Sequence, residues 1–198
     1  MPTPAGKHTK KAKKKTAARS RARKPDVFES CVEITADGFR RELRRELRAA
    51  GLDHNAMPEV AADTIYYLLN ARQMDVLHRE FHAAMTKWAR AIRLAELTYR
   101  DEVFDCDDFT WCFKAFASMR ALKVNQDTGR HLRRPAGFAV GVAWGVFPGE
   151  GPHAVNWYLR ANEADDGTLT GKSLWFFDPQ SGRTTAAADV ESLVLIVG

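Results

Sequence analysis

Cysteines and long apolar runs are scarce in this sequence. Three cysteines occur among the 198 residues, without the spacing of a disulfide framework. This odd number favours free thiols in a cytoplasmic or otherwise reducing compartment. No apolar run approaches the roughly 20 residues of a membrane-spanning helix, and no apolar segment follows the basic N-terminus. We therefore expect neither a transmembrane segment nor a secretory signal peptide.

Acidic residues are absent from residues 7–24, which hold ten lysines or arginines. Without these ten, 20 basic residues face all 25 acidic ones, so the rest of the chain carries a charge of about −5. Residues 1–25 contain almost no large apolar side chain, and we predict a disordered basic tail. Such a tail attracts phosphate backbones without reading sequence, although it has no aromatic residues to stack on bases. We predict non-specific nucleic-acid or polyanion binding through residues 7–24.

Helical periodicity dominates the sequence from residue 36 to residue 122. Phe39, Leu43 and Leu47 recur at four-residue steps among arginines and glutamates, which indicates an amphipathic helix from about Asp37. Further helices are predicted from about Pro58 through residue 73, over residues 74–97 and over residues 106–122. The long helix over residues 74–97 is expected to direct one apolar face to the core: Leu77, Phe81, Met85, Trp88, Ile92 and Leu97.

Strand-like segments follow in the C-terminal part of the chain. Residues 137–147, 154–161 and 172–179 are rich in β-branched and aromatic residues and are separated by turn segments. Helices followed by an antiparallel sheet predict an α+β fold. We expect one domain over residues 26–198, with a helical part at 36–122 and a sheet part at 136–198.

His78 and His82 stand one helical turn apart, which is a spacing that metal ligands use. No acidic partner of the HExxH kind accompanies them. We therefore do not expect zinc at this pair.

Cys106, His153 and Asp178 form the candidate site. Cys106 begins a predicted helix, where partial positive charge and free N–H groups lower the pKa of a thiol and can stabilise an oxyanion. His153 begins a strand after a glycine-rich turn, and Asp178 ends another strand. Papain-like and transglutaminase-like enzymes use this arrangement, in which histidine activates cysteine and a third side chain orients the histidine. The alternative is a buried structural cysteine and a surface histidine.

The segments FDCDDFTWCFKAF, FAVGVAWGV, HAVNWYL and LWFFDPQSG occur in this order within residues 99–183. This succession resembles the C-terminal protease domain of fungal chimerolectins of the Marasmius oreades agglutinin type. The resemblance implies a papain-like, calcium-dependent cysteine peptidase acting on a peptide or protein substrate, with Cys106, His153 and Asp178 as its catalytic triad. Transglutaminase-like acyl transfer uses the same residues and stays open as an alternative.

Two departures from that family bear on the expected function. The family's third catalytic residue is a glutamate, and Asp178 is one methylene shorter, so its strand must approach the histidine more closely. The repeats of the sugar-binding β-trefoil are absent, so glycan targeting is not carried over. A second interpretation is a catalytically inactive papain-like structural protein that binds polyanions or nucleic acid through its basic tail.

Acidic side chains crowd the segment around Cys106: Asp101, Glu102, Asp105, Asp107 and Asp108. Unneutralised, these carboxylates raise the pKa of the thiol. Calcium neutralises such a cluster readily because it prefers several oxygen ligands in flexible geometry. We hypothesise that Asp107 and Asp108, with Asp101, Glu102 or Asp105, bind Ca²⁺. The alternative is helix capping, because carboxylates in a first helical turn interact favourably with the helix dipole.

A side-chain amide is expected to complete an oxyanion site with the N–H group of Cys106. Gln180 is the candidate, because it lies two residues after Asp178 and would share its side of a continuing strand. Asn156 lies three residues after His153, so its side chain points to the opposite face of the strand. We expect Asn156 to be structural.

Overall fold

The computed structural model of the chain describes residues 25–52, 63–94, 104–130 and 134–197. The basic tail lies outside the described residues, and with it the predicted disorder and the predicted polyanion-binding segment. Asp101, Glu102 and Leu97 lie outside them as well.

The described chain has a mixed N-terminal part and a C-terminal part that consists mainly of strands. In order its elements are η1 (Val27–Ser30), β1 (Val32–Thr35), α1 (Ala36–Ala49), β2 (Ile65–Leu68), α2 (Ala71–Ala91), α3 (Cys106–Asp127), β3 (Gly137–Phe138), β4 (Val140–Phe147), β5 (Gly151–Glu163), β6 (Leu169–Phe177), β7 (Thr184–Ala186), η3 (Ala187–Asp189) and β8 (Ser192–Val197). A side-chain N-cap begins each α-helix: Thr35 for α1, Asn70 for α2 and Asp105 for α3.

The strands form two sheets. The larger sheet has the order β7-β6-β5-β4-β8, and all of its strand pairs are antiparallel. The smaller sheet has the order β1-β2-β3, with an antiparallel β1–β2 pair and a parallel β2–β3 pair. A parallel bridge between Leu69 and Arg160 joins the end of β2 to β5. The two sheets are therefore connected through the backbone.

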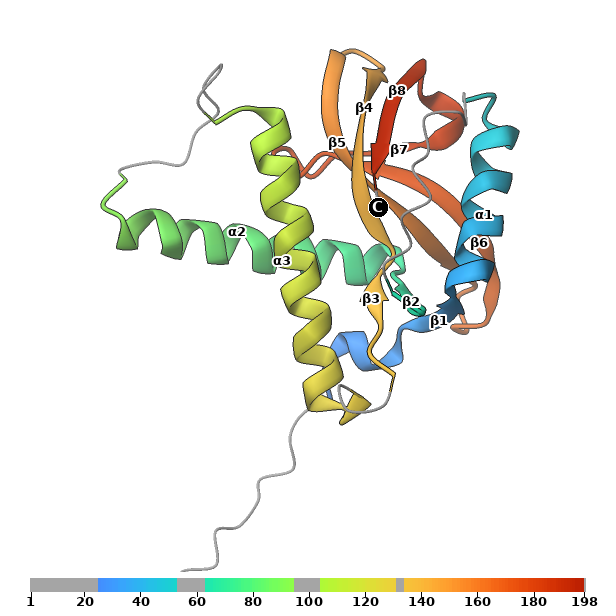
Figure 1. The fold of residues 1–198 in the computed structure, drawn as a ribbon, viewed down its shortest axis with the longest axis horizontal. Coiled ribbons are helices and arrows are strands. Elements are labelled where there is room, and N and C mark those ends of the chain that lie inside the picture. Colours follow the sequence, from blue (N-terminus) through green and yellow to red (C-terminus); the bar gives the residue numbers. More distant parts are fainter. Residues whose placement is uncertain (1–24, 53–62, 95–103, 131–133, 198) are drawn as a thin grey trace, which may run out of the picture.

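The larger sheet separates two apolar cores. α1 covers one face, and α2 and α3, which cross each other, cover the other face (Figure 1). Phe39, Leu43 and Leu47 are buried in the α1 core, as their spacing predicts. On the other face, Phe81 of α2 packs edge-to-face on Phe113 of α3, with ring centroids 5.2 Å apart.

Strand β5 presents alternate residues to the two cores. Val155 and Trp157 belong to the α1 core, whereas Tyr158 belongs to the core of α2 and α3, and Asn156 bonds to α3. This alternation follows from the two-residue period of a strand. His153 lies two residues before Val155 on the same strand, so it belongs to the α1 face of the sheet as well.

The expectation of a helix from about Pro58 is wrong where the structure describes it. Ile65–Leu68 form strand β2, and α2 begins at Ala71. The β-branched and aromatic side chains of IYYL favour a strand, and Asn70 caps the helix that follows. Because β1 and β2 both lie in the N-terminal part of the chain, that part is not a purely helical half. Residues 53–62 lie outside the described residues.

The core face predicted for the long helix is correct as far as Met85, which is partly buried against the core of α2 and α3. Met74, Leu77 and Phe81 of α2 are buried. Trp88 and Ile92 are 50% and 53% exposed and belong to neither core. The apolar period of this helix thus continues beyond the part of it that packs on the sheet.

A β-bulge lies where β8 pairs with β4. Gly145 pairs with Leu193 and Trp144 pairs with Leu195, so Val194 is the extra residue of β8. A Cβ atom on Gly145 would lie 2.3 Å from the backbone carbonyl oxygen of Ser192. Only glycine therefore accommodates this close approach without a backbone shift.

We expect Gly145→Ala to lower the free energy of unfolding by about 1–3 kcal/mol, because the added methyl group forces β4 and β8 apart. Urea denaturation followed by circular dichroism measures the change. The matched control is Gly171→Ala in β6, where a new Cβ atom meets only Asn162 Nδ2 at 3.9 Å. Equal loss of stability in both variants would contradict the role assigned to Gly145.

Candidate functional site

The first turn of α3 is held by its own carboxylates. Asp105 accepts a hydrogen bond from the N–H group of Asp107 at 3.3 Å, and Asp108 accepts one from the N–H group of Asp105 at 3.4 Å. The second of these bonds belongs to a capping box, in which the Asp105 side chain also accepts from the N–H group of Asp108. Cys106 is the first residue of the helix, as its sequence context predicts. The capping alternative for the acidic segment is therefore realised in the structure.

Asp105 and Asp107 also interact through their side chains. Hydrogen bonding between the two carboxyl groups lowers the pKa of Asp105 and raises the pKa of Asp107. Oxygen atoms of both carboxyl groups and the sulfur of Cys106 lie within 4.8 Å of one another. Asp105 and Asp107 are thus two of the three described members of the predicted calcium site, the third being Asp108.

A buried amide anchors α3 to the sheet. The Nδ2 atom of Asn156 donates to the Thr110 carbonyl at 3.1 Å and to the Gly141 carbonyl at 3.0 Å. The Thr110 hydroxyl donates to the Cys106 carbonyl at 2.6 Å. Asn156 is 0% exposed, and the prediction that it is structural is confirmed.

An open cleft of about 600 Å³ lies beside the start of α3. Its lining is mainly apolar, and it is formed by Cys106, Asp107, Trp144, Gly145, Val146, Pro152, His153, Ala154 and Val194. The Trp144 ring packs against Trp111 of α3, with ring centroids 5.9 Å apart. Val194, the extra residue of the β-bulge, is 73% exposed at the rim. A cavity of this size and character is typical of ligand sites.

The thiol of Cys106 is half-buried in this cleft. Burial raises the pKa of the thiol, and the charges of Asp105 and Asp107 raise it further. A hydrogen bond from the backbone N–H group of Ala154 acts in the opposite direction. Burial, with a smaller contribution from the negative surroundings, thus outweighs the helix N-terminus, whose positive partial charge alone would lower the thiol pKa.

The imidazole of His153 faces two carboxylates. Its Nε2 atom lies 3.7 Å from Glu150 Oε2 and 3.9 Å from Asp178 Oδ1. These distances describe ion pairs that are longer than direct hydrogen bonds. The interaction with Asp178 raises the pKa of His153, burial opposes this, and the charge of Glu150 adds to the increase.

Asp178 is held by the backbone of the loop that follows it. Its carboxylate accepts hydrogen bonds from the N–H groups of Gln180 at 2.8 Å and Ser181 at 3.2 Å, and from the Ser181 hydroxyl. Burial works against the ionised form, but His153, Ser181 and Gln180 together lower the pKa of Asp178 to about 2. Asp178 is thus a firmly ionised partner for His153.

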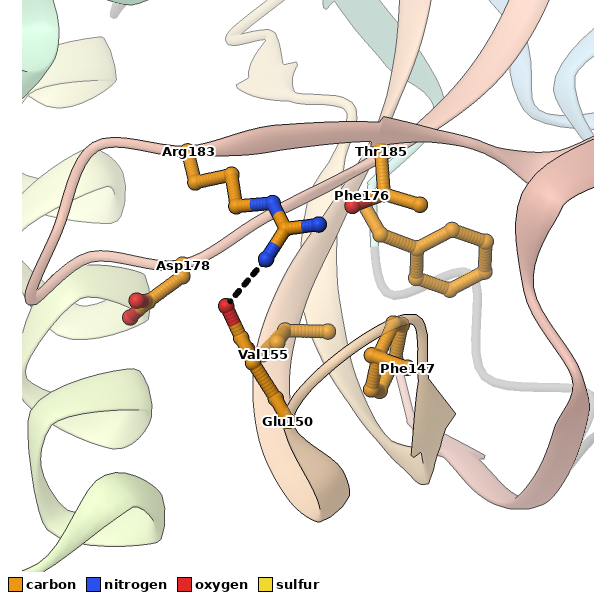
Figure 2. Close-up of a pocket in the computed structure, with 7 residues that line it drawn as sticks. All are labelled: Phe147, Glu150, Val155, Phe176, Asp178, Arg183 and Thr185. Atoms are coloured by element: carbon orange, nitrogen blue, oxygen red, sulfur yellow. Dashed lines mark hydrogen bonds and ion pairs between the residues drawn. The ribbon is translucent and has the colours of Figure 1, made fainter.

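Arg183 and Glu150 close the site on the α1 face. The Arg183 guanidinium pairs with Glu150 at 2.9 Å and donates to the Pro148 carbonyl at 3.0 Å. Figure 2 shows this pair beside Asp178, above a small cavity that Phe147, Val155, Phe176 and Thr185 complete. The sequence analysis missed both charged residues. Glu150 had a local signal, because it lies in the glycine-rich turn three residues before His153, whereas Arg183 had none.

The structure brings the predicted site residues together only in part. His153 lies beside Asp178, and Cys106 and His153 line the same cleft. Within the described residues no hydrogen bond joins the thiol to the imidazole, whose Nε2 atom faces Glu150 and Asp178. Gln180 does not line the cleft, and its Nε2 atom is buried without a hydrogen-bond partner in the described structure.

Comparison with known proteins gives a family and a set of similar folds. A family model described as "Agglutinin C-terminal" matches residues 76–184. A solved structure described as "PSL1a-E64 complex" is similar at 22% identity and a TM-score of 0.55, over 84% of this chain and 50% of that chain. Polyporus squamosus lectin bound to the human-type influenza-binding epitope Neu5Aca2-6Galb1-4GlcNAc is similar at 21% identity and a TM-score of 0.55, over 84% and 49%. The chain spans about half the length of these structures, and no curated protein matches it.

The expectation of a papain-like or transglutaminase-like fold is wrong on these findings. The similar solved structures are those of PSL1a and a lectin. Within the described residues, the chain departs from the expected plan of a helical half followed by a sheet half. A second sheet, β1-β2-β3, combines strands from both halves of the chain.

The expectation of a cysteine peptidase with a peptide or protein substrate is also wrong on these comparisons. The matching family is an agglutinin family, and one similar structure is a lectin with its glycan epitope. The geometry supplies a physical reason, because the imidazole faces two carboxylates and makes no hydrogen bond to the thiol among the described contacts. The inactive papain-like alternative falls with the papain-like fold. No helix in the described part of the chain combines the length and apolar character needed to cross a membrane.

Proposed function

Since the chain belongs to the Agglutinin C-terminal family, we propose that it is a ligand-binding domain of a carbohydrate-binding protein and that its cleft binds a saccharide. The observation that carries this proposal is the cleft itself, in which one wall is aromatic and one end is polar. The glycan-bound state of Polyporus squamosus lectin supports the choice of ligand class.

The chemistry of the cleft suits a sugar ring. The ring's C–H groups present an apolar face that packs on an indole such as Trp144, and its hydroxyl groups bind carboxylates and imidazoles such as Asp107 and His153. Without a bound cation, the charge of Asp107 disfavours an anionic sugar at that end. We therefore assign a neutral saccharide to the cleft rather than a sialylated one.

We expect Galβ1-4GlcNAc to quench or shift tryptophan fluorescence in a saturable manner. In calcium-free buffer the sialylated trisaccharide is expected to bind roughly fivefold more weakly, because one like-charge contact costs about 1 kcal/mol in water. Trp144→Ala is expected to weaken binding at least about tenfold, since an aromatic contact is lost. The control is Trp88→Ala, which removes a tryptophan that is 50% exposed on α2 and does not line the cleft. No saturable signal, or equal binding by both variants, would overturn the proposal.

A second candidate function is favoured by the thiol in the cleft. We propose that Cys106 is a reactive thiol that bonds to electrophilic ligands, with His153 as its proton acceptor and Asp178 as the side chain that orients His153. PSL1a forms a complex with E64, which makes E64 a reasonable ligand to test here. Gln180 stays a predicted oxyanion donor, but its absence from the cleft lining gives it no support.

We expect iodoacetamide to alkylate Cys106 at least about tenfold faster than Cys31, because Cys106 borders an open cleft and burial raises the pKa of Cys31 to about 12. In this reaction the Cys106 sulfur displaces iodide and forms a C–S bond. Peptide mass spectrometry measures the rates, and prior incubation with E64 is expected to protect Cys106. Cys106→Ser should lose the fast phase, and Cys112→Ser should keep it. Equal labelling of all three thiols without protection would refute this candidate.

We also propose that Asp105 and Asp107 bind Ca²⁺. Their carboxylates lie close enough to share one ion, and oxygen ligands are those that calcium prefers. Asp108 stays a predicted further ligand, although its carboxylate is engaged in the capping box. A bound calcium would neutralise the negative charge around Cys106 and fix the first turn of α3.

Calcium at roughly 100 times its dissociation constant is expected to raise the melting temperature by about 5 °C. Asp105→Asn and Asp107→Asn should abolish this shift, and asparagine still caps a helix. Differential scanning calorimetry with calcium and with magnesium measures the effect. Asp189→Asn, in the exposed 3-10 helix η3, is the control that should retain the shift. A shift that survives in the Asp105 and Asp107 variants would place the ion elsewhere.

Two further expectations from the sequence stay proposals. Residues 7–24 are proposed to bind nucleic acid or other polyanions without sequence preference, because their ten basic residues are uncompensated. A reducing compartment is proposed because Cys31, Cys106 and Cys112 are free thiols.

A further inference from the structure

His78 and His82 of α2 both contact the loop that begins at Asp178. Their Nε2 atoms lie 3.1 Å and 2.9 Å, respectively, from one atom, the carbonyl oxygen of Pro179. A carbonyl oxygen has two lone pairs, so it can accept from both imidazoles at once. Because a carbonyl cannot donate, each Nε2 atom must carry a proton in this arrangement.

The two rings are packed as well as hydrogen-bonded. They meet edge-to-face with centroids 4.4 Å apart, and His78 meets Phe177 in the same manner at 4.9 Å. Gly182 has a φ of +76°, and a Cβ atom there would lie 2.7 Å from His78 Cε1. Burial lowers the pKa of His78, which favours a neutral ring. The loop backbone and the histidine pair therefore fit closely together.

These contacts give the one-turn spacing of the histidine pair a structural use. Both Nε2 atoms are engaged as donors to a carbonyl oxygen, so neither Nε2 atom can bind a metal ion, which needs a nitrogen without a proton. The spacing of His78 and His82 thus serves the loop.

The loop that they hold is closed on itself. The Asp178 N–H group donates to the Arg183 carbonyl at 2.9 Å, and the Gly182 N–H group donates to the Asp178 carbonyl at 2.9 Å. The Asp178 carboxylate accepts the Gln180 N–H group across the same turn. A shift of the Pro179 carbonyl would therefore move the backbone on both sides of Asp178.

We infer that His78 and His82 are positioning residues for the cleft: through the Pro179 carbonyl they fix the Asp178–Arg183 loop, and through Asp178 they set the orientation of His153. Two donors that converge on one oxygen fix the direction of the carbonyl, which a single donor would leave free to swing. That these two histidines matter for ligand binding rests on the proposed function. Their effect on the orientation of His153 does not depend on it.

The test removes and then restores the donors. In the full chain, His78→Leu and His82→Leu remove the donor and keep an apolar side chain, whereas His78→Gln and His82→Gln keep an N–H donor. We expect both leucine variants to increase hydrogen exchange at the Gly182 amide about tenfold, as the loss of one hydrogen bond allows. We also expect the pKa of His153, followed by NMR, to fall toward that of a free histidine. The glutamine variants should restore both values.

Arg79→Leu, on the exposed part of the same helix, is the matched control and should change neither readout. Leucine variants with an unchanged His153 pKa and unchanged Gly182 exchange would overturn the inference. So would leucine and glutamine variants that behave alike, because packing and not hydrogen bonding would then be responsible.

A measurement on the unaltered protein protects the test against variants that fail to fold. The inference requires the Nε2–H tautomer of both His78 and His82, which ¹⁵N chemical shifts report. An Nδ1–H tautomer at either residue would overturn it. None of these readouts needs a saccharide, so failed saccharide binding with positive exchange and tautomer results would reject the proposed function alone.

Discussion

The position of the cleft depends on one buried amide. Asn156 bridges the Thr110 carbonyl in the first turns of α3 and the Gly141 carbonyl in β4. Thr110 in turn donates its hydroxyl to the Cys106 carbonyl. Two walls of the cleft, the helix start and the strand with Trp144, are thus joined through a single side chain of β5. Hydrophobic packing alone would not fix this junction, because it is non-directional, whereas hydrogen bonds to two carbonyls specify both distance and angle.

The same strand explains why the imidazole of His153 pairs with carboxylates in this structure and makes no hydrogen bond to the thiol among the described contacts. On β5, Asn156 belongs to the face that α3 covers, and His153 has the opposite parity. The imidazole therefore pairs with Asp178 and Glu150 on the α1 face, while the thiol belongs to the α3 face. The two groups share a cleft only because both lie near the end of the sheet. The order of Cys106, His153 and Asp178 along the chain does not indicate on which face of the sheet each side chain lies.

Local features of this protein could be predicted from sequence. The core face of α1, the start of α3 at Cys106 and the structural role of Asn156 follow from periods and from short-range hydrogen bonding. The features that the sequence did not predict depend on contacts between residues far apart in the chain. Strand β2 gains its place by pairing with β1 and β3, and the contact between His78 and Pro179 spans 101 positions. No single window of sequence contains both partners of such a contact.

The distribution of charge limits what the chain can bind at two places, the cleft and the basic segment of residues 7–24. The cleft contains Asp107 with Asp105 beside it, and Glu150 and Asp178 lie behind His153, with Arg183 as the partner of Glu150. This surplus of negative charge suits a cation or a neutral ligand and repels phosphate groups. The ten basic residues of 7–24 have the opposite preference. A polyanion on the tail and a neutral saccharide in the cleft would therefore not compete, and the chain could hold both at once.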